Sequence, residues 1–174
     1  VYIQDATHRN MMWFMSASLE KFYNIIGYID RTSSATRRTN HFEFPYTIFA
    51  RLFSSGEIDL DASCLMYDSN KTLKDTIYYG QLRSKDGSVV HSGGNLTGEG
   101  DGDDESIVVS LKNVPASIQY LAFTINSFRG QTFDQIDNAF CRLVNLGNNA
   151  EVCRYTLNEK GSHTGVIMAV VFSL

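Results

Sequence analysis

The sequence predicts an all-β fold, an antiparallel β-sandwich of about eight strands, with an α-helix appended at its N-terminus. Three observations predict it. From about residue 41 onward, short apolar or alternating runs recur between Asn, Gly and Asp turns, which is typical of antiparallel sandwiches. Before residue 40, apolar residues recur instead at spacings of three and four. Finally, 43% of the 174 residues are hydrophobic, enough to bury one core.

The N-terminal helix is predicted over residues 8–30, where apolar side chains form a single stripe. They are Met12, Met15, Leu19, Phe22, Ile26 and Ile29. The next ten residues, RTSSATRRTN (31–40), are polar and basic and have no apolar period, so they are interpreted as a linker. We therefore expect two parts: residues 1–40 with the helix and the basic linker, and residues 41–174 with the β-domain.

Eight strands are expected in the second part, each bounded by turn-forming residues. They are 42–53, 58–67, 76–82, 106–111, 119–126, 139–144, 151–157 and 165–172. The last run, GVIMAVVFSL, is apolar at successive positions, which predicts a strand near the centre of its sheet. The segment FDQIDN (133–138) is expected to form one helical turn.

Acidic residues are unevenly distributed along the chain, although the formal net charge is only −4. Seven of the 19 acids lie in two short segments: Asp59, Asp61, Glu99, Asp101, Asp103, Asp104 and Glu105. The remaining 12 acids are outnumbered by 15 Lys and Arg residues. The chain therefore carries a concentrated anionic site on a mildly basic body. No stripe of Lys and Arg with interleaved aromatic residues is present, so nucleic acid is not an expected partner.

The cysteines and the apolar runs bear on the compartment. Cys64, Cys141 and Cys153 have unrelated spacings and include no Cys-x-x-Cys pair, so neither a zinc site nor a disulfide framework is indicated. We therefore expect an intracellular, reducing compartment, either cytoplasmic or organellar. No uncharged apolar run reaches the roughly 18 residues of a membrane-spanning helix, so the chain is not expected to be transmembrane.

The first acidic segment, IDLDASC (58–64), alternates between apolar and polar residues. In an extended strand Asp59, Asp61 and Ser63 share one face, with the two carboxylates about 7 Å apart. At that distance two like charges repel by roughly 2–3 kcal/mol if the effective dielectric constant is about 20. Either these acids are fully solvated or cations neutralise them.

The second acidic segment, GNLTGEGDGDDE (94–105), combines carboxylates with an amide side chain and glycines that let a loop turn its carbonyls inward. These hard oxygen donors suit Ca²⁺, which accepts six to eight of them, better than the stricter octahedron of Mg²⁺. Transition metals prefer His or Cys, and here only His91 is near. An EF-hand does not fit, because its sixth position is Cys64 and its twelfth is Asn70. A solvated acidic loop remains the alternative.

Three segments together resemble one known family. IDLDASCLMYDSNKT (58–72), GSVVHSGGNLTGEGDGDDE (87–105) and GQTFDQIDNAFCRLVN (130–145) resemble the tellurium-resistance TerD family in order and spacing. The likeness extends from about Thr47 to the C-terminus, about three quarters of the chain. It implies a β-sandwich that binds two Ca²⁺ ions between acidic loops and has no known enzymatic activity. It also implies a link to tellurite resistance and stress responses, as a scaffold in larger, often membrane-associated complexes.

The resemblance also implies the site residues. Asp59 and Asp61 match the acids of the first family motif. Asn95, Asp101, Asp103, Asp104 and Glu105 match the second motif, and Gly98, Gly100 and Gly102 would supply turns and carbonyl ligands. Together with Glu99, these residues form the expected metal site, with one or two Ca²⁺ ions and no catalytic residue. Gly94 stands where the family usually has Asp, which weakens or removes one of the two sites.

The expected function is therefore that of a non-enzymatic, calcium-binding TerD-like domain (residues 41–174), acting as a structural or regulatory interaction module in a larger, stress-related assembly. Protein partners are expected to dock on the 8–30 helix, and any membrane association is expected to be indirect. Two alternatives stay open. One is a TerD-fold assembly subunit with reduced or lost metal binding. The other is a metal-dependent hydrolase, which needs an open coordination position and a concave pocket.

Overall fold

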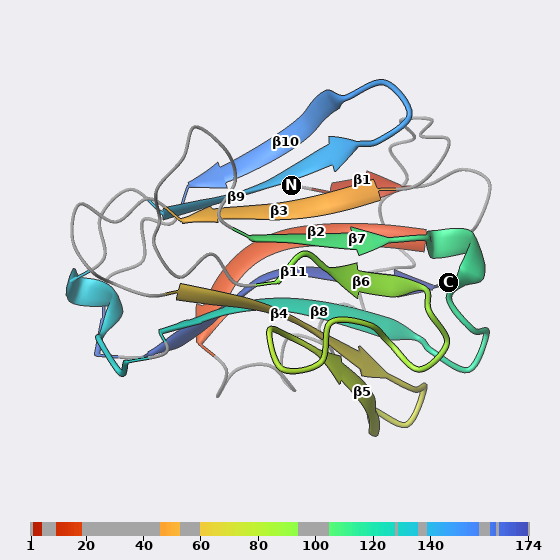
Figure 1. Ribbon diagram of the computed structural model, residues 1–174, viewed down its shortest axis with the longest axis horizontal. Helices are drawn as coiled ribbons and strands as arrows, with labels where there is room; N and C mark the ends of the chain where they lie inside the picture. The colour runs from red at the N-terminus through yellow and green to blue at the C-terminus, as the bar shows by residue number, and fades with distance from the viewer. Residues whose placement is uncertain are drawn as a thin grey trace.

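Two antiparallel β-sheets make up nearly all of the regular structure that is described (Figure 1). The computed structural model describes residues 2–4, 10–18, 46–52, 60–93, 105–127, 129–135, 139–156, 161–162 and 164–173. The predicted class, an all-β chain with antiparallel sheets and few helices, is confirmed. Among the described residues, no helix reaches the length and hydropathy that crossing a membrane requires.

The first sheet has six strands in the spatial order β1-β2-β11-β8-β4-β5. Their bounds are β1 Tyr2–Gln4, β2 Asn10–Ser18, β11 Gly165–Ser173, β8 Tyr120–Ser127, β4 Leu60–Tyr67 and β5 Leu73–Ile77. The apolar run at the C-terminal end, β11, lies between β2 and β8, as its composition predicts. It contains no turn residue after Gly165, and its residues 166–171 are all buried.

The second sheet has five strands in the order β10-β9-β3-β7-β6. Their bounds are β10 Ala150–Thr156, β9 Ala139–Asn145, β3 Tyr46–Leu52, β7 Glu105–Val109 and β6 Val89–His91. Two short 3-10 helices join strands of different sheets: η2, Leu111–Asn113, follows β7, and η3, Phe133–Gln135, follows β8. The helical turn expected at residues 133–138 is thus confirmed at its first three residues.

Both sheets contribute side chains to one hydrophobic core. Its members from the first sheet include Met66, Phe123 and Met168, and those from the second include Ile107 and Leu143. Each is at most 3% exposed. Burying a side chain of this size stabilises the fold by about 1.5–3 kcal/mol relative to leaving it in water. This shared core holds the two sheets together and so fixes the positions of their strand ends.

The strand β4 has the alternation that its sequence predicts. Leu60, Ala62 and Cys64 are buried, whereas Asp61 and Ser63 are partly exposed. Side chains of a strand point alternately to its two faces, so the apolar positions enter the core and the polar positions leave it.

The helix predicted over residues 8–30 is wrong for the part of it that is described. Residues 10–18 form β2, which pairs with β1 on one side and with β11 on the other. The run MMWFMSAS is apolar at most positions, and such a run is compatible with either a central strand or a buried helix. Pairing with β11 decides the outcome. The rest of the predicted helix, residues 19–30, and the linker, residues 31–40, lie outside the described residues.

One strand prediction also needs correction, and two described strands are absent from the prediction. The strand expected at 76–82 is β5, which begins at Leu73 and ends at Ile77, because a tight turn follows immediately. In this turn the backbone of Tyr78 exchanges two hydrogen bonds with that of Gln81. The strand β6 is absent from the prediction, since its three residues are too few for a period to emerge. The strand β1 is also absent from the prediction.

Candidate functional site

The predicted metal site is described at two of its eleven residues. Asp61 lies on β4 and Glu105 is the first residue of β7. The other nine lie outside the described residues: Asp59, Asn95, Gly98, Glu99, Gly100, Asp101, Gly102, Asp103 and Asp104. Among the described side chains, no group of three or more His, Cys, Asp or Glu residues could hold a metal ion. The calcium site therefore stays a prediction, and the structure defines the framework around it.

Asp61 is positioned by the pairing of β4 with β8, where it lies opposite Asn126. Its two neighbours along the strand, Leu60 and Ala62, are buried, while Asp61 is partly exposed. The carboxylate is thus on the face of the sheet that turns away from the core shared with the second sheet.

Glu105 connects the two acidic motifs. It begins β7 opposite Ala50 of β3, and it is only 3% exposed. Its Oε2 accepts a hydrogen bond from the backbone N–H of Ala62 at 2.5 Å, across 43 residues of sequence. Ala62 follows Asp61 directly, so the structure brings the end of the second acidic motif onto the middle of the first.

His91, the last residue of β6, completes this contact. Its side chain is fully buried, and its Nε2 lies 3.1 Å from the carbonyl oxygen of Ala62 and 3.6 Å from Oε2 of Glu105. The backbone N–H of Gly93 donates to His91 Nδ1 at 2.9 Å. Because Nδ1 accepts, the neutral ring carries its proton on Nε2 and donates it to the Ala62 carbonyl. Both backbone groups of Ala62 are therefore held by side chains from the second sheet.

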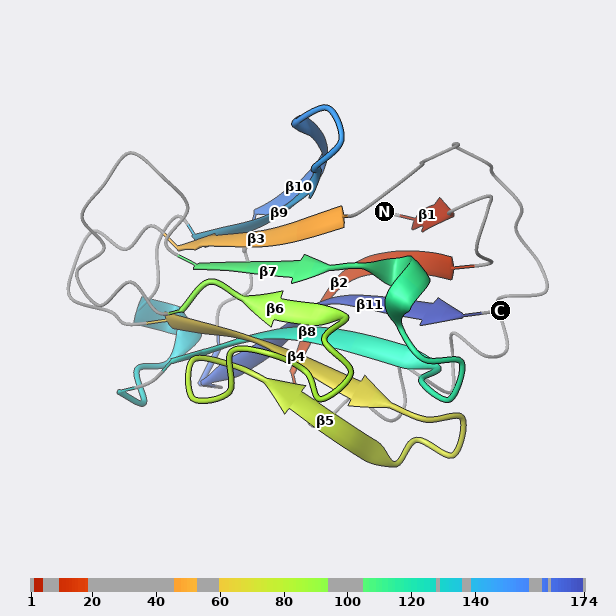
Figure 2. The same cartoon turned by 45° about the vertical axis from the view of Figure 1, so that its right-hand side comes forward.

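Hydrogen bonds next to His91 and Glu105 close the base of the acidic segment 94–104. The backbone N–H of Ser92 donates to the carbonyl of Ser106 at 2.8 Å, and the N–H of Ser106 donates to Ser92 Oγ at 2.9 Å. Gly93, the next residue, has a φ of 95°, a backbone conformation that residues with a Cβ atom rarely adopt. The end of β6 and the starts of β7 and β4 lie at the same end of the molecule (Figure 2).

Sequence reasoning missed the roles of His91 and Ala62. It considered His91 only as a possible ligand for a transition metal, since it is the single histidine near the acidic segment. The only signal of its burial in the sequence is its position directly after two apolar residues, Val89 and Val90. Its partner Ala62 has no signal, because the contact depends on how the two sheets are packed.

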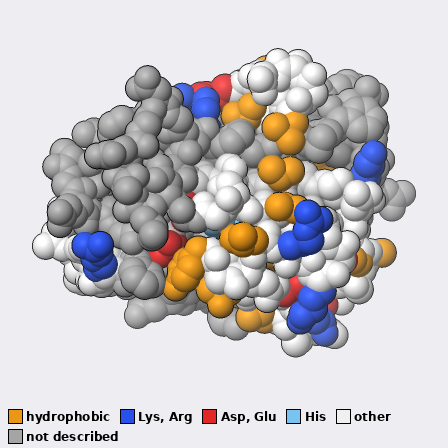
Figure 3. Space-filling model, viewed as in Figure 1, with side chains coloured by type: hydrophobic (Ala, Val, Ile, Leu, Met, Phe, Trp, Pro, Cys, Tyr) orange, Lys and Arg blue, Asp and Glu red, His pale blue; other side chains and the backbone are white. Residues whose placement is uncertain are grey.

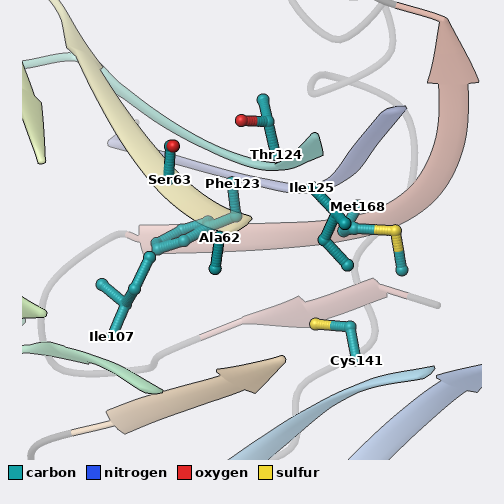
Figure 4. Close-up of a pocket in the computed structure, with 8 residues that line it drawn as sticks. All are labelled: Ala62, Ser63, Ile107, Phe123, Thr124, Ile125, Cys141 and Met168. Atoms are coloured by element: carbon teal, nitrogen blue, oxygen red, sulfur yellow. The ribbon is translucent and has the colours of Figure 1, made fainter. Parts of the chain in front are cut away.

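A small cavity lies in the core near β4. The residues that line it are Ala62, Ser63, Ile107, Phe123, Thr124, Ile125, Cys141 and Met168. In the close-up, the hydroxyls of Ser63 and Thr124 point away from the space between the sheets, while Cys141 and Met168 lie within it (Figure 4). The side chains that enter this cavity are apolar or sulfur-containing, so it lacks the convergent polar groups that a hydrolase site requires.

The buried cysteine of β4 is not a candidate nucleophile. Cys64 is fully buried and free. Burial, and secondarily the negative charge of Asp75, raises the pKa of its thiol far above the usual range. Only the thiolate is nucleophilic or binds metal, so Cys64 is a packing residue.

A surface with both apolar and charged side chains covers β5 and the hairpin after it. The exposed apolar residues there are Leu73, Tyr78, Tyr79 and Leu82. Figure 3 shows hydrophobic side chains beside Lys and Arg side chains in this area. Two of its lysines are close to acids: Lys74 Nζ lies 2.8 Å from Asp68, and Lys85 Nζ lies 3.9 Å from Asp75. This surface is therefore close to neutral and does not attract a strongly charged ligand.

The sequence of this chain matches a protein-family model and several relatives. A family model described as "TerD domain" matches residues 35–173. The chain is 56% identical to tellurium resistance protein TerZ of Serratia marcescens over 112 residues, which cover 64% of this chain and 58% of TerZ. It is 41% identical to stress response protein SCP2 of Bacillus subtilis (strain 168) over 133 residues, covering 71% of this chain and 67% of SCP2.

The fold has a counterpart among solved structures. The crystal structure of a homologue of telluride resistance protein (TerD) from Streptomyces coelicolor A3(2) superposes with a TM-score of 0.61 and 18% identity, covering 72% of this chain and 79% of that one. At this identity the match supports the fold alone. The present chain spans about three fifths of the length of TerZ.

Proposed function

Because this chain belongs to the TerD family, we propose that it is a calcium-binding β-sandwich domain with a structural or regulatory role in a stress-related assembly. It would be non-enzymatic: one or two Ca²⁺ ions would order the acidic segments, and the ordered surface would be recognised by protein partners. Relatives named for tellurium resistance and for stress response support the physiological part of this proposal.

The observation that carries the proposal is the contact between Glu105 and Ala62. Glu105 ends a segment with five carboxylates in seven positions, and Ala62 follows Asp61 directly. The contact therefore anchors one acidic motif beside the other. Carboxylates held close together repel each other, and a divalent cation removes this cost by accepting their oxygens as ligands.

The donor set fits calcium. Asp59, Asp61, Asn95 and the acids from Glu99 to Asp104 supply hard oxygen ligands, and the glycines between them allow carbonyl oxygens to join. Asp61 is partly exposed and leaves the core-facing side of β4, so its carboxylate is accessible to an ion. The ion would supply positive charge that holds the two motifs together.

Protein partners are part of this proposal. Residues 10–18 are hydrogen-bonded in the sheet to β1 and β11. The docking role expected of the 8–30 segment stays a proposal, with residues 10–18 already paired in the sheet and residues 19–30 outside the described residues. Any association with a membrane would occur through such a partner.

Isothermal titration calorimetry with Ca²⁺ on the chelator-treated chain tests the proposal. We expect saturable uptake at or below millimolar Ca²⁺, and weaker uptake in Asp61→Asn. Glu151→Gln is the matched control, because it also removes one carboxylate, but from the exposed edge strand β10. Absence of uptake by the wild-type chain at millimolar Ca²⁺ would reject the calcium proposal.

A second candidate is a TerD-fold assembly subunit with reduced or lost metal binding. Gly94 favours it, since this position is usually Asp in the family motif. Native mass spectrometry distinguishes the two: masses with one or two bound calcium ions support the first candidate, and apoprotein in calcium-containing buffer supports the second. A metal-dependent hydrolase is the third reading, and it would require turnover that a chelator abolishes.

A further inference from the structure

The backbone of Ala62 lies at a gap in the first sheet. Strand β4 is paired with β8 along the whole length of β4, from Leu60 to Tyr67. On the other side of β4, the pairing with β5 begins only at Cys64. The N–H and C=O of Ala62 therefore lie beyond the described end of β5, at a position that is 3% exposed. Buried backbone groups without partners are costly, so this gap has to be filled.

Side chains of the second sheet fill the gap. Glu105 Oε2 accepts the Ala62 N–H, and His91 Nε2 faces the Ala62 carbonyl at 3.1 Å. One side chain accepts and the other donates, as a neighbouring strand would do. Gly93 fixes the orientation of the imidazole ring by donating to Nδ1. The contact is thus a small buried network that joins Glu105 Oε2, both nitrogens of the His91 ring and the backbone groups of Ala62 and Gly93.

The same two residues border the acidic segment. His91 ends β6 and Glu105 begins β7, and residues 94–104 lie between them. On the other side of the contact, Ala62 follows Asp61 in β4. The contact therefore joins the backbone next to Asp61 to the two residues, His91 and Glu105, that flank the acidic segment in the sequence.

We propose that His91 and Glu105 are positioning residues for the calcium site, and that Glu105 acts through Ala62 rather than as a ligand of the ion. This inference rests on the proposed function. Burial supports it, because the Glu105 side chain is 3% exposed and its Oε2 is directed at the backbone of Ala62 and at His91. The pair would hold the two acidic motifs at the separation that suits the ion.

Glu105 variants separate positioning from coordination. In Glu105→Gln the amide oxygen still accepts the Ala62 N–H, whereas Glu105→Ala removes the acceptor. Loss of residues that orient a metal ligand typically weakens metal affinity by about 10–100-fold. We therefore expect Glu105→Ala to weaken calcium affinity by about tenfold or more, and Glu105→Gln to stay within about threefold of wild type.

His91 variants provide the second arm. His91→Phe keeps an aromatic ring in the buried position but removes both the donor to Ala62 and the acceptor for Gly93. His91→Gln retains a donor to the Ala62 carbonyl. We expect the Phe variant to bind calcium about tenfold more weakly and the Gln variant to recover most of the affinity.

Asp75→Asn is the matched control for general destabilisation. Asp75 is also a buried carboxylate that accepts a backbone N–H, from Lys85 at 2.8 Å, and it lies opposite Met66, four residues along β4 from Ala62. It should lower the melting temperature without changing calcium affinity. Amide NMR spectra of each apo variant check that the fold is intact, and the amide resonances of Ala62 and Gly93 report the contact directly.

The outcomes are distinct. Weak binding in Glu105→Ala and His91→Phe, with recovery in both Gln variants and no change in Asp75→Asn, supports the inference. If Glu105→Gln binds as weakly as Glu105→Ala, then Glu105 is a ligand and the inference is overturned. Unchanged affinity in both disruptive variants overturns it as well, while the calcium proposal stands. A wild-type chain that takes up no calcium overturns both.

Discussion

Asp75 gives a quantitative test of how the hairpin after β5 is held. The residue lies on β5, and its side chain is 8% exposed. Its Oδ2 accepts the backbone N–H of Lys85 at 2.8 Å, and its Oδ1 accepts Gln81 Nε2 at 2.8 Å and the N–H of Thr76 at 3.1 Å. One carboxylate therefore connects three positions of the segment that leads from β5 to β6.

The change Asp75→Asn leaves one acceptor oxygen where there were two. If that oxygen keeps the Lys85 N–H, the new amide NH₂ group faces the donors of Thr76 and Gln81, so at least one partly buried donor loses its acceptor. Leaving such a group unsatisfied costs about 1–3 kcal/mol, and hydrogen bonds to a charged acceptor contribute about 1.5–3 kcal/mol. We expect the free energy of unfolding to fall by about 2 kcal/mol at pH 7.

The pH dependence gives an independent check. Burial is the largest single influence and raises the pKa of Asp75, but the hydrogen bonds from Lys85, Gln81 and Thr76, together with the Lys85 charge, outweigh it. The folded-state pKa therefore lies below the ordinary value of 3.8. Because the pKa of Asp75 is lower in the folded state than in the unfolded state, the ionised carboxylate stabilises the fold at pH values above the ordinary pKa. This stability is lost as the pH falls through the folded-state pKa.

Urea unfolding at pH 7 and in steps below pH 4, followed by circular dichroism, measures both effects. The difference between wild type and Asp75→Asn should be largest near neutral pH and should shrink in acid. A variant within about 0.5 kcal/mol of wild type at pH 7 would contradict the assigned hydrogen bonds, since changes that small are typical of unconnected surface sites. A difference that is constant with pH would contradict the role of the charge.

Substitutions at three further positions test the packing, the turns and the surface. Phe133, at the start of η3, is fully buried, so Phe133→Ala should lower the free energy of unfolding by about 3–5 kcal/mol, measured by urea denaturation. A fall in the free energy of unfolding no larger than that of a typical surface substitution would show that the ring does not pack in the core. Gly87 has a φ of 76° in the turn after Ser84, so Gly87→Ala should cost about 1–2 kcal/mol, whereas Gly87→Asn should cost less. Glu151 pairs with Arg142 and Arg154 on the exposed edge of β10, so Glu151→Ala should lower the free energy of unfolding, measured from thermal melting, by less than about 1 kcal/mol. A larger fall would show that these ion pairs stabilise the fold more than exposed pairs usually do.

The strand β4 shows what a short stretch of sequence can determine. Its alternation of Leu60, Asp61, Ala62 and Ser63 predicts a strand with one buried and one polar face, and the structure has both. Local sterics set the period of a strand at two, so the pattern and the structure agree without any knowledge of neighbouring strands.

The strand β2 shows the limit of the same reasoning. The residues MMWFMSAS fit either a buried helix or a central strand, and their position between β1 and β11 selects the strand. That choice depends on β11, which lies about 150 residues further along the chain, and no local pattern contains it.

The acidic site divides in the same way. The sequence by itself determined that seven carboxylates lie in two short segments, the second of them rich in glycine, and it predicts calcium as the cation that suits them. Only the tertiary structure decided that Glu105 and His91 meet the backbone of Ala62, because this contact joins residues 43 and 29 positions apart and crosses from one sheet to the other. Composition fixes which atoms are available to bind, whereas the packing of two sheets around one core fixes which of them can meet.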